Sequence, residues 1–99
     1  MTKKYCPRKP YEVNHYKVGY HAIERMKLRL VSKGEVGYNL RKKPLQITPV
    51  VFDIKGRPSY RRLSDNKTLT CINPKDNFVT NAWHFSSKLL SKLLRRKSK

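Results

Sequence analysis

The sequence predicts a small α+β domain, in which two N-terminal helices pack on an antiparallel meander of about four strands. Apolar residues recur at helical spacing before Pro44, whereas after Leu45 they form short runs separated by turn signals. The chain has 99 residues, of which 37% are hydrophobic, enough for one modest core. We expect a single domain over residues 1–99, with an irregular basic arm (1–16), a core (17–84), and a basic terminal helix and tail (85–99).

The two predicted helices follow the arm, which holds two prolines and shows no clear period. Apolar spacing predicts the first helix over residues 18–31. The segment that begins at Ser32 reads Ser-Lys-Gly-Glu, a capping box, so Ser32 is expected to open the second helix. This helix ends before Pro44, because proline cannot continue it.

The predicted strands are runs of β-branched and aromatic residues between turns rich in glycine, proline and asparagine. Alternation of apolar and polar residues within a run favours one buried and one exposed face. After Ser86, paired leucines at helical spacing predict a short basic C-terminal helix. The four predicted strands cover residues 50–54, 59–63, 68–72 and 78–83.

The most unusual property of the chain is its charge. Twenty-four lysines and arginines stand against six acidic residues, a formal net charge of +18. Self-repulsion on this scale favours a polyanionic partner, with nucleic acid ahead of a membrane surface. We expect no signal peptide and no membrane span, and the distant Cys6 and Cys71 indicate two free thiols in a reducing cytoplasm.

Three side chains of the first helix lie on one stripe. His21, Arg25 and Arg29 are spaced four residues apart, so a helix brings them one turn from each other. Histidine can act as acid or base near neutral pH, and arginine binds phosphate oxygens in pairs. The stripe therefore predicts a phosphodiester site. A histidine that completes a helix interface, with arginines that are only solvated, is the alternative interpretation.

Other candidates lie in the predicted sheet. Tyr60 and Arg62 share one face of their strand, whereas Arg61 lies on the other, and His84 follows the last strand. Our candidates for substrate binding are Arg29, Tyr60, Arg62 and His84. Spacing alone favours an ordinary strand residue for Thr80. The acidic residues are scattered and no phosphate-binding glycine loop is present, so we expect no metal site and no cofactor.

A family resemblance rests on the segment His21-Ala-Ile-Glu-Arg25-Met, followed by Arg29 and Val36. It resembles the opening of small bacterial toxin-like H-A-x-x-R-M domains, whose last strand carries a threonine as Phe-Val-Thr80 does here. Those domains in turn resemble the barnase, EndoU, colicin and RelE superfamily of metal-independent ribonucleases. The resemblance spans about residues 18–83. It implies His21 as the acid or base, Arg25 as a phosphate or structural partner, and Thr80 as a phosphate-orienting hydroxyl.

The same resemblance implies a function. The expected activity is that of a metal-independent endoribonuclease, a toxin that cleaves tRNA or mRNA by transesterification. It would act in the bacterial cytoplasm or in the cytoplasm of a cell into which it is delivered, and an acidic antitoxin or immunity protein would cover it. The alternative function is a non-catalytic basic protein that binds RNA or DNA.

Overall fold

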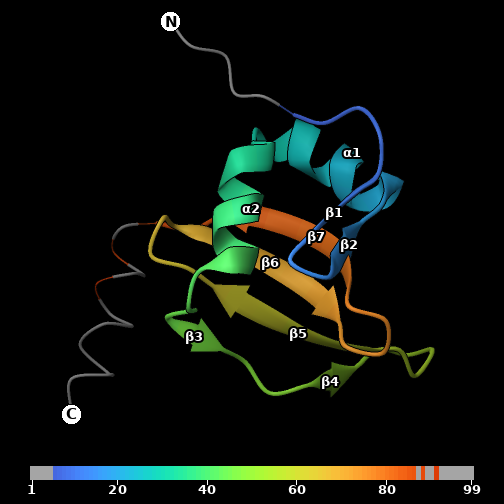
Figure 1. The fold of residues 1–99 in the computed structure, drawn as a ribbon. Coiled ribbons are helices and arrows are strands. Elements are labelled where there is room, and N and C mark those ends of the chain that lie inside the picture. The colour runs from blue at the N-terminus through green and yellow to red at the C-terminus, as the bar shows by residue number, and fades with distance from the viewer. Residues whose placement is uncertain (1–5, 87, 89–90, 92–99) are drawn as a thin grey trace, which may run out of the picture.

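Two helices lie on one side of a seven-stranded mixed sheet in the computed structural model, which describes residues 6–86, 88 and 91 (Figure 1). The strand order is β1-β2-β7-β6-β5-β3, and β4 also pairs with β5. Every pair is antiparallel except β2 with β7. The elements are β1 (Tyr11–Val13), β2 (Tyr16–Val18), α1 (Tyr20–Arg29), α2 (Lys33–Arg41), β3 (Gln46–Ile47), β4 (Val51–Phe52), β5 (Pro58–Leu63), β6 (Thr68–Asn73) and β7 (Phe78–His84).

The predicted layout is wrong at the N-terminus, where the expected irregular arm contains a hairpin. Asn14 and His15 both have positive φ, 49° and 68°, as a two-residue hairpin turn requires. The strands on either side, β1 and β2, alternate partly buried and exposed residues. Because β2 then runs parallel to the start of β7, the sheet is mixed and not an antiparallel meander.

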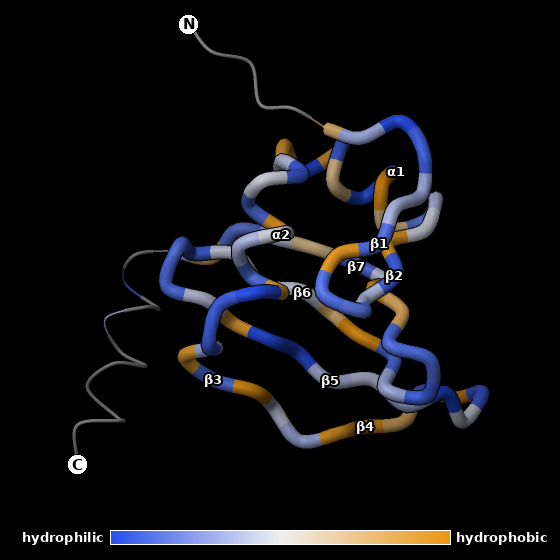
Figure 2. Tube along the Cα trace, viewed as in Figure 1, coloured by the Kyte–Doolittle hydropathy of each residue, from blue (hydrophilic) through white to orange (hydrophobic). Residues whose placement is uncertain are grey.

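The predicted sheet of about four strands is also wrong at its other edge. The expected strand over residues 50–54 is reduced to β4, and β3 was not predicted. Pro49 lies between them and has no N–H to donate, which explains why this edge forms two short strands. Figure 2 shows hydrophobic residues along it, and Val51 and Phe52 are more than half exposed. The predicted strands over 59–63, 68–72 and 78–83 correspond to β5, β6 and β7.

Capping and a close glycine contact define the two helices. The predicted capping box is confirmed: Ser32 Oγ accepts from the Glu35 N–H at 3.1 Å, and Glu35 accepts from the Ser32 N–H at 2.9 Å. A Cβ on Gly19 would lie 2.5 Å from the Phe78 ring, so any larger residue where the start of α1 meets β7 would force that ring to move. The first helix is shorter than predicted, because Leu30 ends it in the left-handed region at φ 55°.

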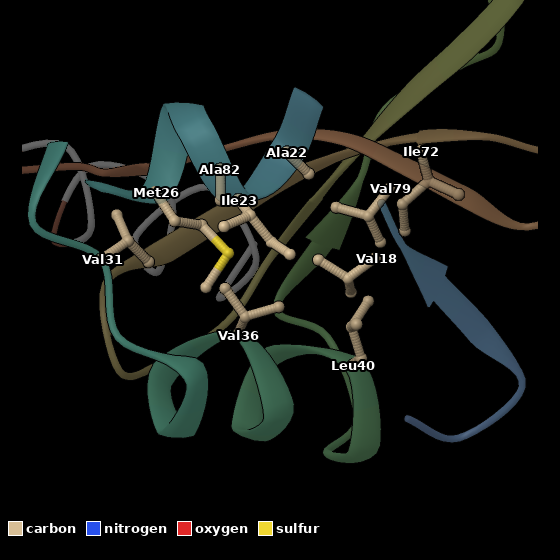
Figure 3. Close-up of a cluster of buried hydrophobic side chains, with 10 residues drawn as sticks. All are labelled: Val18, Ala22, Ile23, Met26, Val31, Val36, Leu40, Ile72, Val79 and Ala82. Carbon is tan, nitrogen blue, oxygen red and sulfur yellow. The ribbon is translucent and has the colours of Figure 1, made fainter. Parts of the chain in front are cut away.

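The core lies between the helices and one face of the sheet. Figure 3 shows its side chains pointing toward one another from α1, α2, β2, β6 and β7, and from the segment between the two helices. No described helix has the length and apolarity needed to cross a bilayer. The predicted C-terminal helix over 85–99 falls outside the described residues, apart from 85, 86, 88 and 91. The core residues are Val18, Ala22, Ile23, Met26, Val31, Val36, Leu40, Ile72, Val79 and Ala82.

The two faces of the central strands differ in their cover. In β6, Thr68, Thr70 and Ile72 are buried, whereas the residues between them are partly exposed. Thr70 donates to Asn39 of α2 at 2.7 Å, which identifies the buried side as the face under the helices. We call it the helix-covered face. The opposite face of β5, β6 and β7, which neither α1 nor α2 covers, is the open face.

Candidate functional site

A cavity of about 300 Å³ brings residues from distant parts of the chain together. His21 comes from the second position of α1, and Thr80 from β7. Cys71 and Asn73 of β6 and Ser59 of β5 also line it, and these alternate residues of β6 mark the open face. Two of the three residues that the resemblance implies, His21 and Thr80, therefore share one cavity. Its lining residues are His21, Asp53, Arg57, Pro58, Ser59, Cys71, Asn73 and Thr80.

His21 reaches this cavity because of how α1 begins. The helix starts at Tyr20, directly after the contact between Gly19 and Phe78 at the start of β7. The next residue on the helix surface is His21, which is exposed, while Ala22 and Ile23 are buried in the core. The N-terminal end of a helix carries partial positive charge. The imidazole therefore lies in an electrostatic environment that favours an anion.

Thr80 reaches the cavity because of an irregularity in β7. Cys71 of β6 pairs with Asn81, and the next residue of β6 pairs with Val79, so Thr80 has no partner of its own. Such a bulge re-aims side chains and is frequent next to functional sites. Thr80 Oγ1 donates to the Cys71 carbonyl at 3.3 Å, a long hydrogen bond. Sequence alternation alone could not place this hydroxyl, because the bulge shifts the register.

Asp53 and Arg57 line another side of the cavity, and the sequence analysis did not select either. They close the turn between β4 and β5, where Asp53 accepts from the backbone N–H and from Nε of Arg57, both at 2.8 Å. Gly56 completes the turn at φ +77°. The Arg57 backbone donor, followed by its guanidinium, holds the pKa of Asp53 below its ordinary value. Arg57 Nη1 and Nη2 hydrogen-bond no described residue, which leaves them available to an anion.

Arg29 and Arg25 continue the stripe of α1 beyond His21. Arg29 donates to Asn81 Oδ1 at 2.8 Å, and its guanidinium carbon lies 5.1 Å from the centroid of the Trp83 ring. Arg29 therefore borders the open face next to the cavity. Arg25 lies between the two on the helix and is half-buried. It does not line the cavity, and its side chain makes no hydrogen bond or ion pair with any described residue.

Tyr60 and Arg62 point to the helix-covered face, away from His21. Their partners in β6 are the buried Ile72 and Thr70. Burial, and then a hydrogen bond with Tyr16, raises the pKa of Tyr60 to about 12. The Arg62 side chain is buried and donates to the backbone carbonyls of Asn39 and Lys42, both at 2.8 Å. In this structure Arg62 therefore joins β5 to α2, and Tyr60 packs against the core next to Tyr16 of β2.

His84 is also on the helix-covered side, because its partner in β6 is the buried Thr68. Its Nε2 lies 2.7 Å from Oε2 of Glu35, the residue that completes the capping box of α2. The contact joins the end of β7 to the start of α2. The structure thus separates His84 from the cavity that His21 lines.

The composition of the cavity limits its chemistry. Among the described residues, no three His, Cys, Asp or Glu side chains cluster as a metal ion would require. A larger hollow of about 540 Å³ lies beside the β1–β2 hairpin, but no histidine, arginine, serine or threonine lines it. Because the His21 cavity has these side chains, it is our candidate site.

Cys6 and Cys71 are both free thiols, as predicted.

No family model, no curated protein and no solved structure matches this chain. The resemblance to toxin-like ribonuclease domains therefore stays a prediction. Of the residues that the sequence analysis missed, Asp53 and Arg57 carried a turn signal, an aspartate three residues before Gly56. That signal predicts the turn, but only the pairing of β4 with β5 brings the turn to the cavity.

Proposed function

We propose that this protein is a metal-independent endoribonuclease that cleaves RNA by transesterification, as a bacterial toxin would. The observation that carries the proposal is the shared cavity of His21 and Thr80, with Arg57 on another side. A proton-transfer group, a hydroxyl and a guanidinium are the groups that this reaction needs. The formal net charge of +18 supports a polyanionic substrate.

In this reaction the 2′-oxygen of a ribose attacks the adjacent phosphorus, and the bond from phosphorus to the 5′-oxygen breaks. A base takes the proton of the 2′-hydroxyl, and an acid gives a proton to the departing 5′-oxygen. The product on one side is a 2′,3′-cyclic phosphate, and on the other a 5′-hydroxyl. His21 fills one of the two proton-transfer roles.

Arg57 and Thr80 bind the phosphate in this proposal. Arginine stays charged at all working pH values, and its two free terminal nitrogens match two phosphate oxygens. The long hydrogen bond from Thr80 to the Cys71 carbonyl lets the hydroxyl turn and donate to a phosphate oxygen instead. An acidic antitoxin or immunity protein would then block the site by covering this cationic surface.

The experiment is incubation of purified protein with RNA in the presence of a metal chelator. We expect the wild-type protein to cut the RNA and His21→Ala to lose at least about a hundredfold in rate. The variant must remain folded by circular dichroism, and its RNA affinity must stay close to that of the wild type. Intact RNA bound by folded wild-type protein would contradict the proposal and favour the non-catalytic RNA-binding function.

A further inference from the structure

Two arginines from different elements meet at the chain's single tryptophan on the open face. The guanidinium carbon of Arg29 lies 5.1 Å from the centroid of the Trp83 ring, and that of Arg61 lies 5.6 Å from it. Arg29 belongs to α1 and Arg61 to β5, so β6 lies between Arg61 and the tryptophan. We call these three residues the Trp83 cluster.

The Trp83 cluster adjoins the candidate site. Trp83 follows Thr80 by three positions in β7, about 10 Å along a strand. Between them, Asn81 accepts a hydrogen bond from Arg29 at 2.8 Å. Arg61 lines a second cavity, of about 370 Å³, which shares the lining residues Ser59 and Cys71 with the His21 cavity. The open face therefore carries two adjoining hollows, and the cluster borders the second.

The Trp83 cluster concentrates positive charge around one ring. Two like charges repel when they are held at one ring, and Arg61 is exposed while Trp83 is only half-buried. An anion between the two guanidinium groups would remove the repulsion. A nucleotide would in addition place its base against the indole, and such base–aromatic contacts stabilise single-stranded nucleic acids on proteins.

We propose that the Trp83 cluster is a nucleotide subsite for single-stranded RNA, next to the His21 cavity. Arg29 and Arg61 bind the phosphate that neighbours the scissile one, and Trp83 contacts the base of that nucleotide. The subsite positions the strand so that one phosphodiester lies between His21 and Thr80. This inference rests on the proposed function, because it assumes that RNA lies in the cavity.

The fluorescence of Trp83 tests the subsite directly, because the chain has no other tryptophan. The probe is a short single-stranded RNA titrated into the His21→Ala variant, which leaves the RNA uncut. We expect saturable quenching of the emission by RNA, and none by inorganic phosphate at the same concentration. RNA binding that leaves the emission unchanged would overturn the proposal, and equal quenching by phosphate would overturn the base contact.

Arg61→Gln gives a second test, with Arg41→Gln as the matched control. Arg41 is exposed on α2, which packs on the other face of the sheet. We expect Arg61→Gln to weaken RNA binding about tenfold and to lower the salt slope by about one. Arg41→Gln should change affinity less than about twofold. Equal losses in the two variants would mean that only net charge matters, and the subsite would be wrong.

The two proposals fail in different ways. If the wild-type protein cuts RNA while Trp83 emission and the Arg61→Gln affinity stay unchanged, the subsite is wrong and the ribonuclease stands. If RNA stays intact while emission is quenched and Arg61→Gln binds weakly, the Trp83 cluster binds RNA but the ribonuclease is wrong. In the second case, the claim that the Trp83 cluster positions a scissile phosphodiester between His21 and Thr80 would also be wrong.

Discussion

Arg61 and Arg62 are neighbours in β5, yet their guanidinium groups meet different surroundings on the two faces of the sheet. Arg62 is buried and donates to two backbone carbonyls of α2 and its C-terminal cap. Arg61 is exposed on the open face and lies over Trp83. The histidines differ in the same way, because His84 pairs with Glu35 whereas His21 lines an open cavity.

This difference shows that residue type and spacing do not separate a structural cation from a functional one. On the helix-covered face, the side chains of Asn39, Arg62 and Thr70 all hydrogen-bond within the protein. Asn39 is fully buried and joins α2 to β5 and β6 through hydrogen bonds to Arg62, Ser64, Thr68 and Thr70. On the open face, the terminal nitrogens of Arg57 hydrogen-bond no described residue. The predictions below test this contrast.

The largest expected effect separates the two histidines in an assay of RNA cleavage. His21→Gln should lower the rate by at least about a hundredfold, because it removes the proposed proton-transfer group. His84→Gln should keep the rate within about threefold, because an amide can still donate to Glu35. Initial rates on one RNA substrate measure both. Similar losses in the two variants would contradict the proposal that RNA is cleaved in the His21 cavity.

The second effect concerns stability and separates two asparagines. Asn39→Ala should lower the free energy of unfolding by about 2–4 kcal/mol, because it leaves buried partners without hydrogen bonds. Asn81→Ala on the open face should cost about 1 kcal/mol or less. Urea denaturation followed by circular dichroism measures both values. An equal cost at the two positions would mean that the faces do not differ as described.

A smaller effect is expected at the start of α2. Ser32→Ala removes one half of the capping box and should cost about 1 kcal/mol. Ser59→Ala, in the wall of the cavity, should change the stability by less than about 0.5 kcal/mol. The same denaturation experiment applies. RNA cleavage by Ser32→Ala should remain at the wild-type level below its unfolding temperature.

The smallest effect is a change in one titration on the open face. Arg57→Gln removes the guanidinium partner of Asp53, so the pKa of Asp53 should rise toward its ordinary value. In the wild-type protein this lowered pKa contributes stability above the unfolded-state pKa, and the contribution disappears as pH falls through the folded-state pKa. NMR titration of the carboxyl group measures the change. Lys55→Gln is the control, since only its backbone contacts Asp53.

Local patterns were enough to predict the central elements of the fold. The capping box at Ser32 and the alternation in β6 correspond to what the structure contains, because both depend on neighbours in sequence. The hairpin at Asn14 was missed although its turn residues and alternation were present. Its parallel pairing with β7 depends on contacts between distant residues, which no local pattern contains.

The candidate site could be predicted only in part. The stripe from His21 to Arg29 followed from helical spacing, and the structure places both ends of it beside β7. Alternation correctly separated Arg61 from Arg62, but it could not tell which of the two faces the helices cover. Which face is covered depends on where α2 packs. The packing of α2 therefore also determines that Arg62 is buried and Arg61 is exposed.

The central claim is that the His21 cavity cleaves RNA by transesterification, and the chemistry of the cut tests it most directly. The measurement uses two otherwise identical RNA oligonucleotides in a metal chelator, one with a single 2′-deoxy nucleotide at the cleavage position. We predict that the all-ribose strand is cut to a 2′,3′-cyclic phosphate, detected by mass spectrometry, and that the 2′-deoxy strand stays intact there. Cleavage of both strands at equal rates, or a product ending in a 3′-hydroxyl, would contradict the mechanism.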